Sequence, residues 1–452
     1  MIDWLAYVSL TSHRLPMPLL PLRAGPTSAS QSVARLLVAS YAVLLVVTFA
    51  FWFLHIAGQT SLVGYAHRTD FLALYVGARS VATGHGAQLY DLGMQRSQMD
   101  QAIVPYHRSN LMAFVYPGYV AVLLAPLGTL SFSHAVLVFL AVNSVVALWI
   151  AFLVATRFSD SPRDRLVLLM PIFAFVPLQL TLLQNQLGLF PTLGILQGLL
   201  ALRSDRPARA GWWLLMGLLK PQLIAFPLLA LLLWRCWSAL VPFFVGCAAV
   251  LGFSIATLGW WIPHYMAFLR EYNRSGAAMS LFPNAMQNWR GLGYALLQTE
   301  SSIPFRLLLV TLTGLSVTAV VVLCRRSASA FRHAVPAPSP CLWEACFAVV
   351  TLLGILSSPH LYMHDWIVFV PAGVLLWSWI RHLPRHLDHS PRALLGLLAA
   401  CPFVFWFSQF VAWPPQSSIQ LVPWYMGFMA IAGFVSIQRA SKPSQPPNPA
   451  RA

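Results

Sequence analysis

Residues 36–56 read LLVASYAVLLVVTFAFWFLHI and contain no Asp, Glu, Lys or Arg. A helix that crosses a bilayer needs about 20 consecutive apolar residues, so this stretch predicts a transmembrane helix. Further apolar runs follow at approximately 111–131, 134–156, 165–183, 188–202, 210–220, 222–234, 237–258, 305–324, 342–356, 366–380, 393–410 and 421–437. The pattern predicts an all-α, polytopic membrane protein with about 12 spanning helices.

The composition supports this class. Hydrophobic residues make up 58% of the chain and charged residues 9%, whereas soluble domains carry roughly 25% charged residues. The formal net charge is +16. In a soluble protein this charge would suggest a nucleic-acid partner. Here the basic residues lie between apolar runs and are not interleaved with aromatic residues, so we expect membrane lipids and no nucleic acid as partners.

The basic clusters predict the orientation. They are RFSDSPRDR (157–165), RSDRPAR (203–209), RRSASAFR (325–332) and RHLPRHLDHSPR (381–392). Placing them in the cytoplasm with both termini puts 19 of the 28 Lys and Arg residues inside, as the positive-inside rule requires. The predicted organisation is a cytoplasmic arm (1–35), a transmembrane domain (36–437) with external loops 57–110 and 259–304, and a disordered cytoplasmic tail (438–452).

Two regions depart from simple alternation. Residues 210–234 must form two short arms that meet at a turn, KPQ (220–222), which dips into the membrane from outside. Within 111–156, one of the apolar pieces is expected not to cross. Broken helices of this kind are tolerated where they line a cavity enclosed by protein.

The first external loop contains HRTDFLALYVGARSVATGHGAQLYD (67–91), which predicts a helix from Thr69 or Asp70 that ends near Gly84. Asp70 could be the N-cap of this helix or a general base at the membrane surface. An amphipathic helix lying on the bilayer would also explain the pattern without any chemistry. Asp91 is expected to end a loop or to cap the next helix.

Other external stretches contain candidate binding residues. Lys220, one of two Lys residues in the chain, could snorkel to the headgroups or pair with a phosphate. The residues Gln184, Asn185 and Gln186 could form an ordinary polar turn or bind the hydroxyls of a ligand.

The segment SPHLYMHD (358–365) places two histidines four residues apart, His360 and His364. A helix starting at Pro359 would put both on one face. They could bind a metal, although no third ligand is evident, or lie beside a phosphate, or have no chemical role. Arg290 is either a surface residue or part of a cationic cluster with Lys220 and His364.

Five stretches form an ordered set between residues 66 and 380: DFLALYVGARSVATGHGAQLYD (70–91), FVYPGYVAVLLAPLGTL (114–130), LLQNQLGLFPTLGILQGLLAL (182–202), GWWLLMGLLKPQLIAFPLLALLL (211–233) and SSPHLYMHDWIVFVPAG (357–373). The set resembles glycosyltransferase family 87 of the GT-C superfamily, in particular its polyprenyl-phosphate-mannose-dependent α-mannosyltransferases. The chain has Tyr116-Pro117-Gly118 where the family commonly has Tyr-Pro-Pro. It has Gln184-Asn185-Gln186-Leu187 where the family commonly has Gly-Gln-x-Asn.

The resemblance implies a GT-C-type bundle, with amphipathic helices expected in the first external loop, and an active site at the external, periplasmic face of a plasma membrane. It implies a polyprenyl-phosphate sugar as donor, Asp70 as catalytic base and His364 near the donor phosphate. From residue chemistry we expect Lys220, Arg290 and His360 to assist with that phosphate. The acceptor would be a hydroxyl of a lipid or glycan, and no metal or other cofactor is expected.

Two alternatives remain open at the level of sequence. A lipid or polysaccharide transporter or flippase would show paired half-chain repeats, which the sequence lacks. A non-catalytic scaffold, or a polymerase or ligase of another fold, is the second alternative. Such a ligase would need a long external loop late in the chain.

Overall fold

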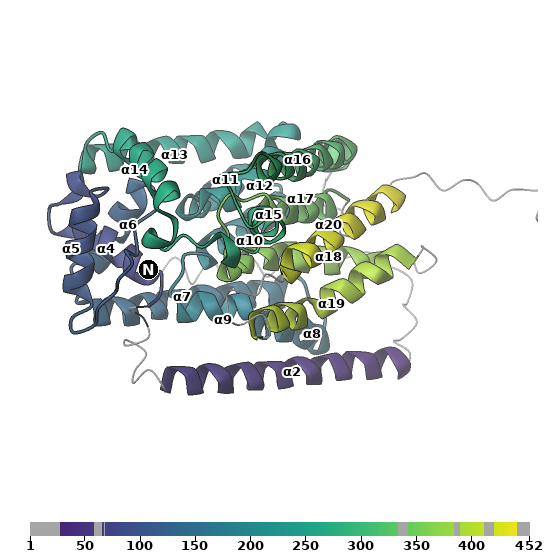
Figure 1. Ribbon diagram of the computed structural model, residues 1–452. Helices are drawn as coiled ribbons and strands as arrows, with labels where there is room; N and C mark the ends of the chain where they lie inside the picture. Colours follow the sequence, from purple (N-terminus) through teal and green to yellow (C-terminus); the bar gives the residue numbers. More distant parts are fainter. Residues whose placement is uncertain are drawn as a thin grey trace, which may run out of the picture.

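The computed structural model describes residues 28–57, 66, 68–332, 342–383, 389–410 and 420–440. Most of the predicted N-terminal arm and of the C-terminal tail therefore lies outside the described residues. Within them all regular structure is helical, and no strand occurs (Figure 1). The first helix begins at Ser28, before the apolar run that predicted it.

The α-helices are α2 (Ser28–Ala57), α4 (Phe71–Ala82), α5 (Leu92–Ala102), α6 (Gly118–Gly128), α7 (Phe132–Arg157), α8 (Pro162–Phe173), α9 (Val176–Leu183), α10 (Leu189–Arg203), α11 (Pro207–Leu214), α12 (Ala225–Leu233), α13 (Trp237–Leu258), α14 (Ile262–Ser275), α15 (Trp289–Leu297), α16 (Ile303–Arg332), α17 (Leu342–Leu356), α18 (Phe369–His382), α19 (His389–Phe410) and α20 (Leu421–Ala440). The 3₁₀ helices are η1 (Gly86–Gln88), η2 (Leu215–Leu219), η3 (Pro221–Leu223), η4 (Gly276–Met279), η5 (Pro283–Ala285) and η6 (Met363–Val368).

Among the described residues, seven helical segments are long and apolar enough to cross a bilayer. They lie in α2, α7, α13, α16, the η6–α18 unit, α19 and α20. The helices α8 and α9, bent by 56° at their junction, would make an eighth if counted as one span. The predicted all-α membrane class is confirmed, with fewer full-length spans than the 12 expected. Several apolar runs form shorter helices instead, including α4, α6, α10 and α17.

Two helix breaks place polar side chains inside the bundle. The run 210–234 forms two short arms as predicted: α11 and η2 lead to Lys220, and η3 and α12 lead away from it. Lys220 itself has φ −145° and ψ 75°, a non-helical conformation, because the following Pro221 disfavours the helical region for the residue before it. Helix α9 ends at a similar break, where Asn185 adopts a positive φ of 49°.

The centre of the bundle is the hairpin of α17 and the η6–α18 unit. Every residue from Trp343 to Leu356 is buried, which fits a helix that is apolar on all sides. The segment that joins these two buried helices, residues 357–362, is thereby held at a fixed depth in the molecule.

Helix α4 begins close to its predicted start, and Thr83 and Gly84 follow its last residue, Ala82, with Gly84 at φ +80°. Nearly all of its residues are buried. This excludes an amphipathic helix resting on a bilayer, because no broad face is left for lipid. The partner is α6, which approaches so closely that a Cβ added to Gly128 would lie 2.4 Å from the Ala78 carbonyl oxygen.

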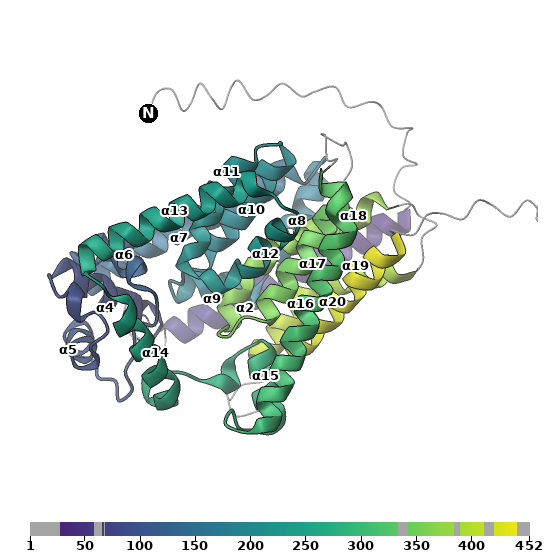
Figure 2. The ribbon, with the colours of Figure 1, turned by 90° about the horizontal axis from the view of Figure 1, so that it is seen from above.

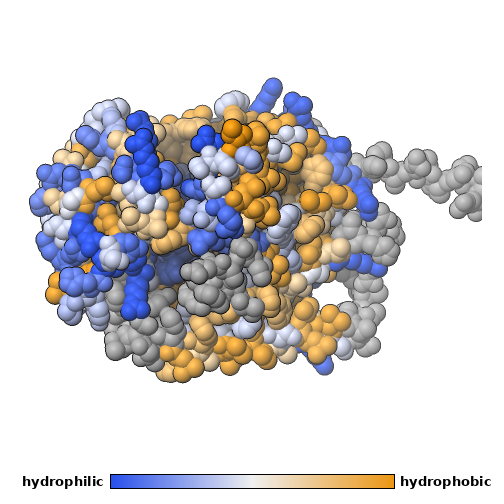
Figure 3. Space-filling model, viewed as in Figure 1, coloured by the Kyte–Doolittle hydropathy of each residue, from blue (hydrophilic) through white to orange (hydrophobic). Residues whose placement is uncertain are grey.

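Figures 1 and 2 show α4, α5 and α14 at one end of the long helices, whereas α2 begins and α20 ends at the other. Figure 3 shows hydrophilic residues gathered over the α4–α5–α14 end and an apolar surface over the long helices. At the opposite end Arg203 forms two hydrogen bonds with Glu344, at 2.7 and 2.6 Å. The loops 68–110 and 259–302 therefore belong to the end opposite to the one where α2 begins and α20 ends (Figures 1 and 2).

The Gly128 contact gives a prediction for stability. Gly128→Ala should destabilise the protein by about 1–3 kcal/mol, because the added methyl group meets backbone that cannot rotate away. The measurement is the thermal unfolding midpoint of the detergent-purified protein. Gly252→Ala, in α13 with nothing within 4 Å of its Cβ position, is the control and should be neutral or stabilising by up to about 1 kcal/mol. Equal midpoints for the two variants would contradict the predicted close packing.

Candidate active site

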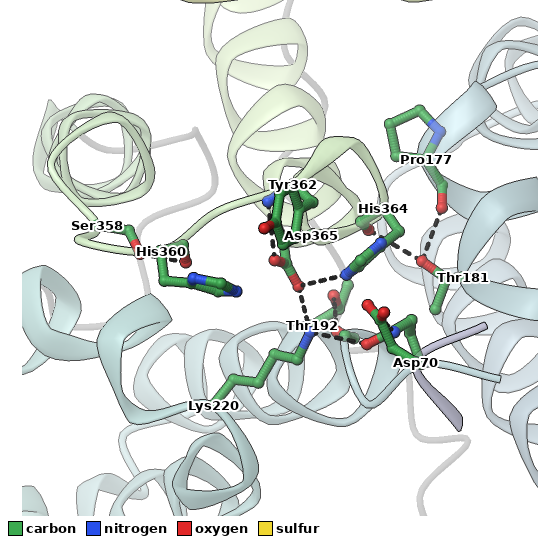
Figure 4. A network of polar contacts seen from close by, with 12 residues as sticks. Asp70, Pro177, Thr181, Thr192, Lys220, Ser358, His360, Tyr362, His364 and Asp365 are labelled. Carbon is green, nitrogen blue, oxygen red and sulfur yellow. Dashed lines mark hydrogen bonds and ion pairs between the residues drawn. The ribbon is translucent and has the colours of Figure 1, made fainter. Parts of the chain in front are cut away.

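Four segments from distant parts of the sequence meet at one end of the bundle (Figure 4). They are the start of α4 with Asp70, the turn after α9 with Gln186, the break before η3 with Lys220, and the start of η6 with His364 and Asp365. Figure 4 shows the side chains of Asp70, Lys220, His364 and Asp365 converging from these segments.

Asp70 stands at the N-cap position of α4, but its side chain makes no capping hydrogen bond. Its Oδ2 instead accepts a hydrogen bond of 2.8 Å from the Gln186 side-chain amide. Among the described residues Oδ1 has no hydrogen-bond partner, and Asp70 lines a cavity. Asp91 behaves as the ordinary cap, since its carboxylate accepts a hydrogen bond of 2.7 Å from the Met94 backbone. The capping alternative for Asp70 is therefore wrong.

Lys220 is buried, with 3% of its surface exposed. Its Nζ lies 2.5 Å from Asp365 Oδ1 and donates to Gln186 Oε1 at 3.0 Å. Snorkelling to the headgroups is excluded, because the ammonium group points to these partners. Asp365 also accepts at Oδ2 from the Tyr362 backbone at 3.2 Å, so a buried cation is matched by a buried, hydrogen-bonded anion.

The histidine segment differs from its prediction. Residues 357–362 are not helical, and η6 begins at Met363, so His360 and His364 do not share a helix face. Both nevertheless line the same cavity. His364 Nε2 lies 3.5 Å from Asp365 Oδ1, and its backbone carbonyl accepts from Thr181 Oγ1 at 2.9 Å.

His360 contributes a neutral imidazole. Burial lowers its pKa to about 4, and the nearby Asp365 opposes this shift without reversing it. At pH 7 the ring can therefore donate or accept a hydrogen bond but adds no positive charge. No group of three His, Cys, Asp or Glu side chains in the described ranges is placed to hold a metal ion.

Arg290 reaches the cavity from the second long loop. It donates to both carboxylate oxygens of Glu300, at 2.6 and 2.8 Å, and to the Pro359 carbonyl at 3.2 Å. Asn288 caps α15 through Gly291 and donates to the Ser358 carbonyl at 2.6 Å. The start of α15 is thus tied to the histidine segment, which fixes the position of the guanidinium.

The cavity has a volume of about 330 Å³, within the usual range for small-ligand sites. Its polar lining includes Asp70, Lys220, Arg290, His360, His364 and Asp365. Aromatic side chains also line it, among them Tyr116, Tyr265 and Tyr272. Burial raises the pKa of Tyr116 to about 12, so this hydroxyl stays protonated.

The three amide residues of the turn after α9 make different contacts. Gln186 is fully buried between Asp70 and Lys220. Asn185 turns away and donates to the Val136 carbonyl at 3.1 Å. None of the three side chains lines the cavity described above, so direct contact of these amides with a ligand finds no support there.

Sequence reasoning missed the two carboxylates that pair with the cations, Asp365 and Glu300. Asp365 had a signal, because it is one of 12 acidic residues in the chain and stands next to a long apolar run. Glu300 had none, since its loop is otherwise an ordinary polar linker.

The sequence matches the family model described as glycosyltransferase family 87 over residues 114–359. This range is more than half of the 452 residues. The chain belongs to glycosyltransferase family 87. No curated protein and no solved structure matches it.

Membership of family 87 makes this chain a membrane glycosyltransferase and removes the transporter and scaffold alternatives. The matched range includes Gln186, Lys220 and Arg290 but stops short of Asp70 and Asp365. For these two side chains the argument comes from the geometry of the site.

The buried ion pair gives a second prediction. Lys220→Met and Asp365→Asn should each destabilise the protein by about 3–5 kcal/mol, because each leaves one buried charge without its partner. The double variant should lose much less than the sum, since neither charge remains. The thermal unfolding midpoints of the four proteins test this coupling, and additive losses would contradict a direct pair.

Proposed function

We propose that this family 87 enzyme transfers a hexose from a polyprenyl-phosphate donor to a hydroxyl of a glycolipid or glycan, and that the hexose is mannose. The reaction takes place in the Asp70 cavity at the external face of the membrane. The observation that carries the proposal is a carboxylate whose Oδ1 accepts no hydrogen bond from the residues that the structure describes, in a cavity that a buried lysine and two histidines also line.

The chemical step is a single displacement. The acceptor oxygen attacks the anomeric carbon, and the bond between that carbon and the phosphate oxygen breaks. The acceptor proton moves to Asp70 Oδ1, and polyprenyl phosphate leaves with the bonding electron pair. One general base suffices, because phosphate needs no protonation to leave.

The carboxylates support inversion at the anomeric carbon. A retaining enzyme would place a second carboxylate as nucleophile about 5–5.5 Å from the first. Among the described residues, the other carboxylate that lines the cavity is Asp365, and Lys220, His364 and the Tyr362 backbone already engage it. Asp365 is therefore not free to act as a second catalytic carboxylate, and the proposed single displacement assigns Asp70 the role of base.

Positive charge near the leaving group would come from Lys220 and Arg290. A phosphodiester donor carries one negative charge, and the departing monoester carries more. Lys220 and Arg290 are held in place by Asp365 and Glu300, so they need not reorganise as this charge develops. His364 and the neutral His360 can add hydrogen bonds, and no metal is required by this scheme.

The role of Asp70 is tested by Asp70→Asn. The variant should fold, because Asp70 makes no capping bond that it could lose. Transfer should fall by roughly 10²–10⁴-fold, the usual contribution of a general base. The assay follows radiolabelled sugar from polyprenyl-phosphate mannose, glucose or galactose into acceptors of the native membrane. Asp91→Asn, which keeps a good cap, is the matched control, and wild-type turnover in Asp70→Asn would sink the mechanism.

The external position of the site is tested by cysteine labelling in a background without the native cysteines. Ala277→Cys, exposed in the second long loop, should react with a membrane-impermeant maleimide on intact cells. Ser204→Cys, exposed in the basic cluster after α10, should react after permeabilisation. The motivation is the distribution of basic residues, and the reverse pattern of labelling would invert the topology.

A further inference from the structure

Gln186 has both ends of its amide committed. Nε2 donates to Asp70 Oδ2 at 2.8 Å, and Oε1 accepts from Lys220 Nζ at 3.0 Å. A carboxylate can only accept and an ammonium can only donate, so these partners allow a single orientation of the amide. Its side chain is fully buried and therefore has no water to replace either partner.

The backbone of Gln186 is equally fixed. Its N–H donates to the Thr181 carbonyl at 2.9 Å, and Asn185 anchors the preceding turn to Val136. The Thr181 hydroxyl in turn donates to the His364 carbonyl. The backbone and side-chain contacts together fix Gln186 in position between the start of α4 and the η6 segment.

We propose that Gln186 is a positioning residue: it orients the Asp70 carboxylate so that Oδ1 faces the acceptor, and it links this base to the Lys220–Asp365 pair. The inference rests on the proposed role of Asp70. It differs from the expectation that Gln186 binds sugar hydroxyls, because the side chain is fully buried and is not among the residues that line the cavity.

The chemistry of the site explains why an amide is needed. A glutamate would place a second carboxylate against Asp70, and a lysine would place a second cation against Lys220. An apolar residue would leave Asp70 free to rotate and Lys220 with one partner fewer. Gln186 both holds the Asp70 carboxylate and keeps it apart from the Lys220 ammonium. A direct ion pair between these two groups would make the carboxylate a weaker base for the proton of the acceptor hydroxyl.

The experiment is a double-mutant cycle with the transfer assay on polyprenyl-phosphate mannose. Gln186→Met should lower kcat on the order of 10- to 100-fold, as expected when a reacting group is displaced by about 1 Å. The KM for the donor should change much less. In the Asp70→Asn background, Gln186→Met should have no further effect on kcat, because there is no base left to orient.

Two further variants keep the test decisive if Gln186→Met folds poorly. Gln186→Asn retains the amide but is one methylene shorter, so it should lose one partner and part of kcat, with a smaller loss of thermal stability than Gln186→Met. Gln184→Met, in the same turn but outside the network, is the matched control and should keep the wild-type kcat. A loss in Gln184→Met equal to that in Gln186→Met would show general damage to the turn and overturn the proposal.

The possible failures are distinguishable. If Asp70→Asn keeps its activity, the proposed function loses its base whatever Gln186 does. If Asp70→Asn is inactive but Gln186→Met and Gln186→Asn turn over normally, the positioning role is wrong and the general base stands. If the losses from Asp70 and Gln186 multiply, or if Gln186→Met raises KM and leaves kcat unchanged, Gln186 acts on the substrate and not through Asp70.

Discussion

The architecture of the site depends on one buried pair of opposite charges. Lys220 and Asp365 are both buried, with Nζ and Oδ1 2.5 Å apart. Either charge alone would be strongly unfavourable in an apolar bundle, so the break before η3 and the start of η6 must stay together. Gln186 extends this constraint to Asp70 and thereby connects α4 to the central hairpin of α17 and α18.

Broken helices make this arrangement possible. An uninterrupted spanning helix satisfies its own backbone and points its side chains into lipid or apolar neighbours. At Lys220 and at Asn185 the chain leaves the helical conformation, and polar side chains project into a protein-lined space. The tight contact between α4 and α6 at Gly128 then places the start of α4 against these breaks.

Apart from Asp70, the charges described in the site are arranged in pairs. Lys220 is matched by Asp365, Arg290 by Glu300, and His360 is neutral because burial lowers its pKa. Such a cavity holds cations in fixed positions without a large net positive charge. Under the proposed function, a singly charged phosphodiester would bind there, and the charge that develops on the leaving phosphate would meet groups already in place.

The amino-acid sequence alone was sufficient for the properties that depend on local composition. Apolar run length identifies an all-α membrane protein, Pro221 marks the break at Lys220, and the periodicity after Asp70 locates α4 within a residue or two. The resemblance to family 87, carried by ordered motifs, was confirmed over residues 114–359. These features can be read from neighbouring residues, because helix length, helix ends and family motifs are encoded within short segments.

Only the tertiary structure decided which polar groups meet. Lys220 finds a partner 145 residues away in Asp365, and Gln186 finds Asp70 at a separation of 116. Sequence reasoning placed Lys220 beside a phosphate without its counter-charge, grouped Gln184 and Asn185 with Gln186, and could not separate a cap from a base at Asp70. The physical reason is that the partner of a buried charge or amide depends on which helix breaks come to the same depth, and the packing of α4, α9, α11–α12 and α17–α18 determines that.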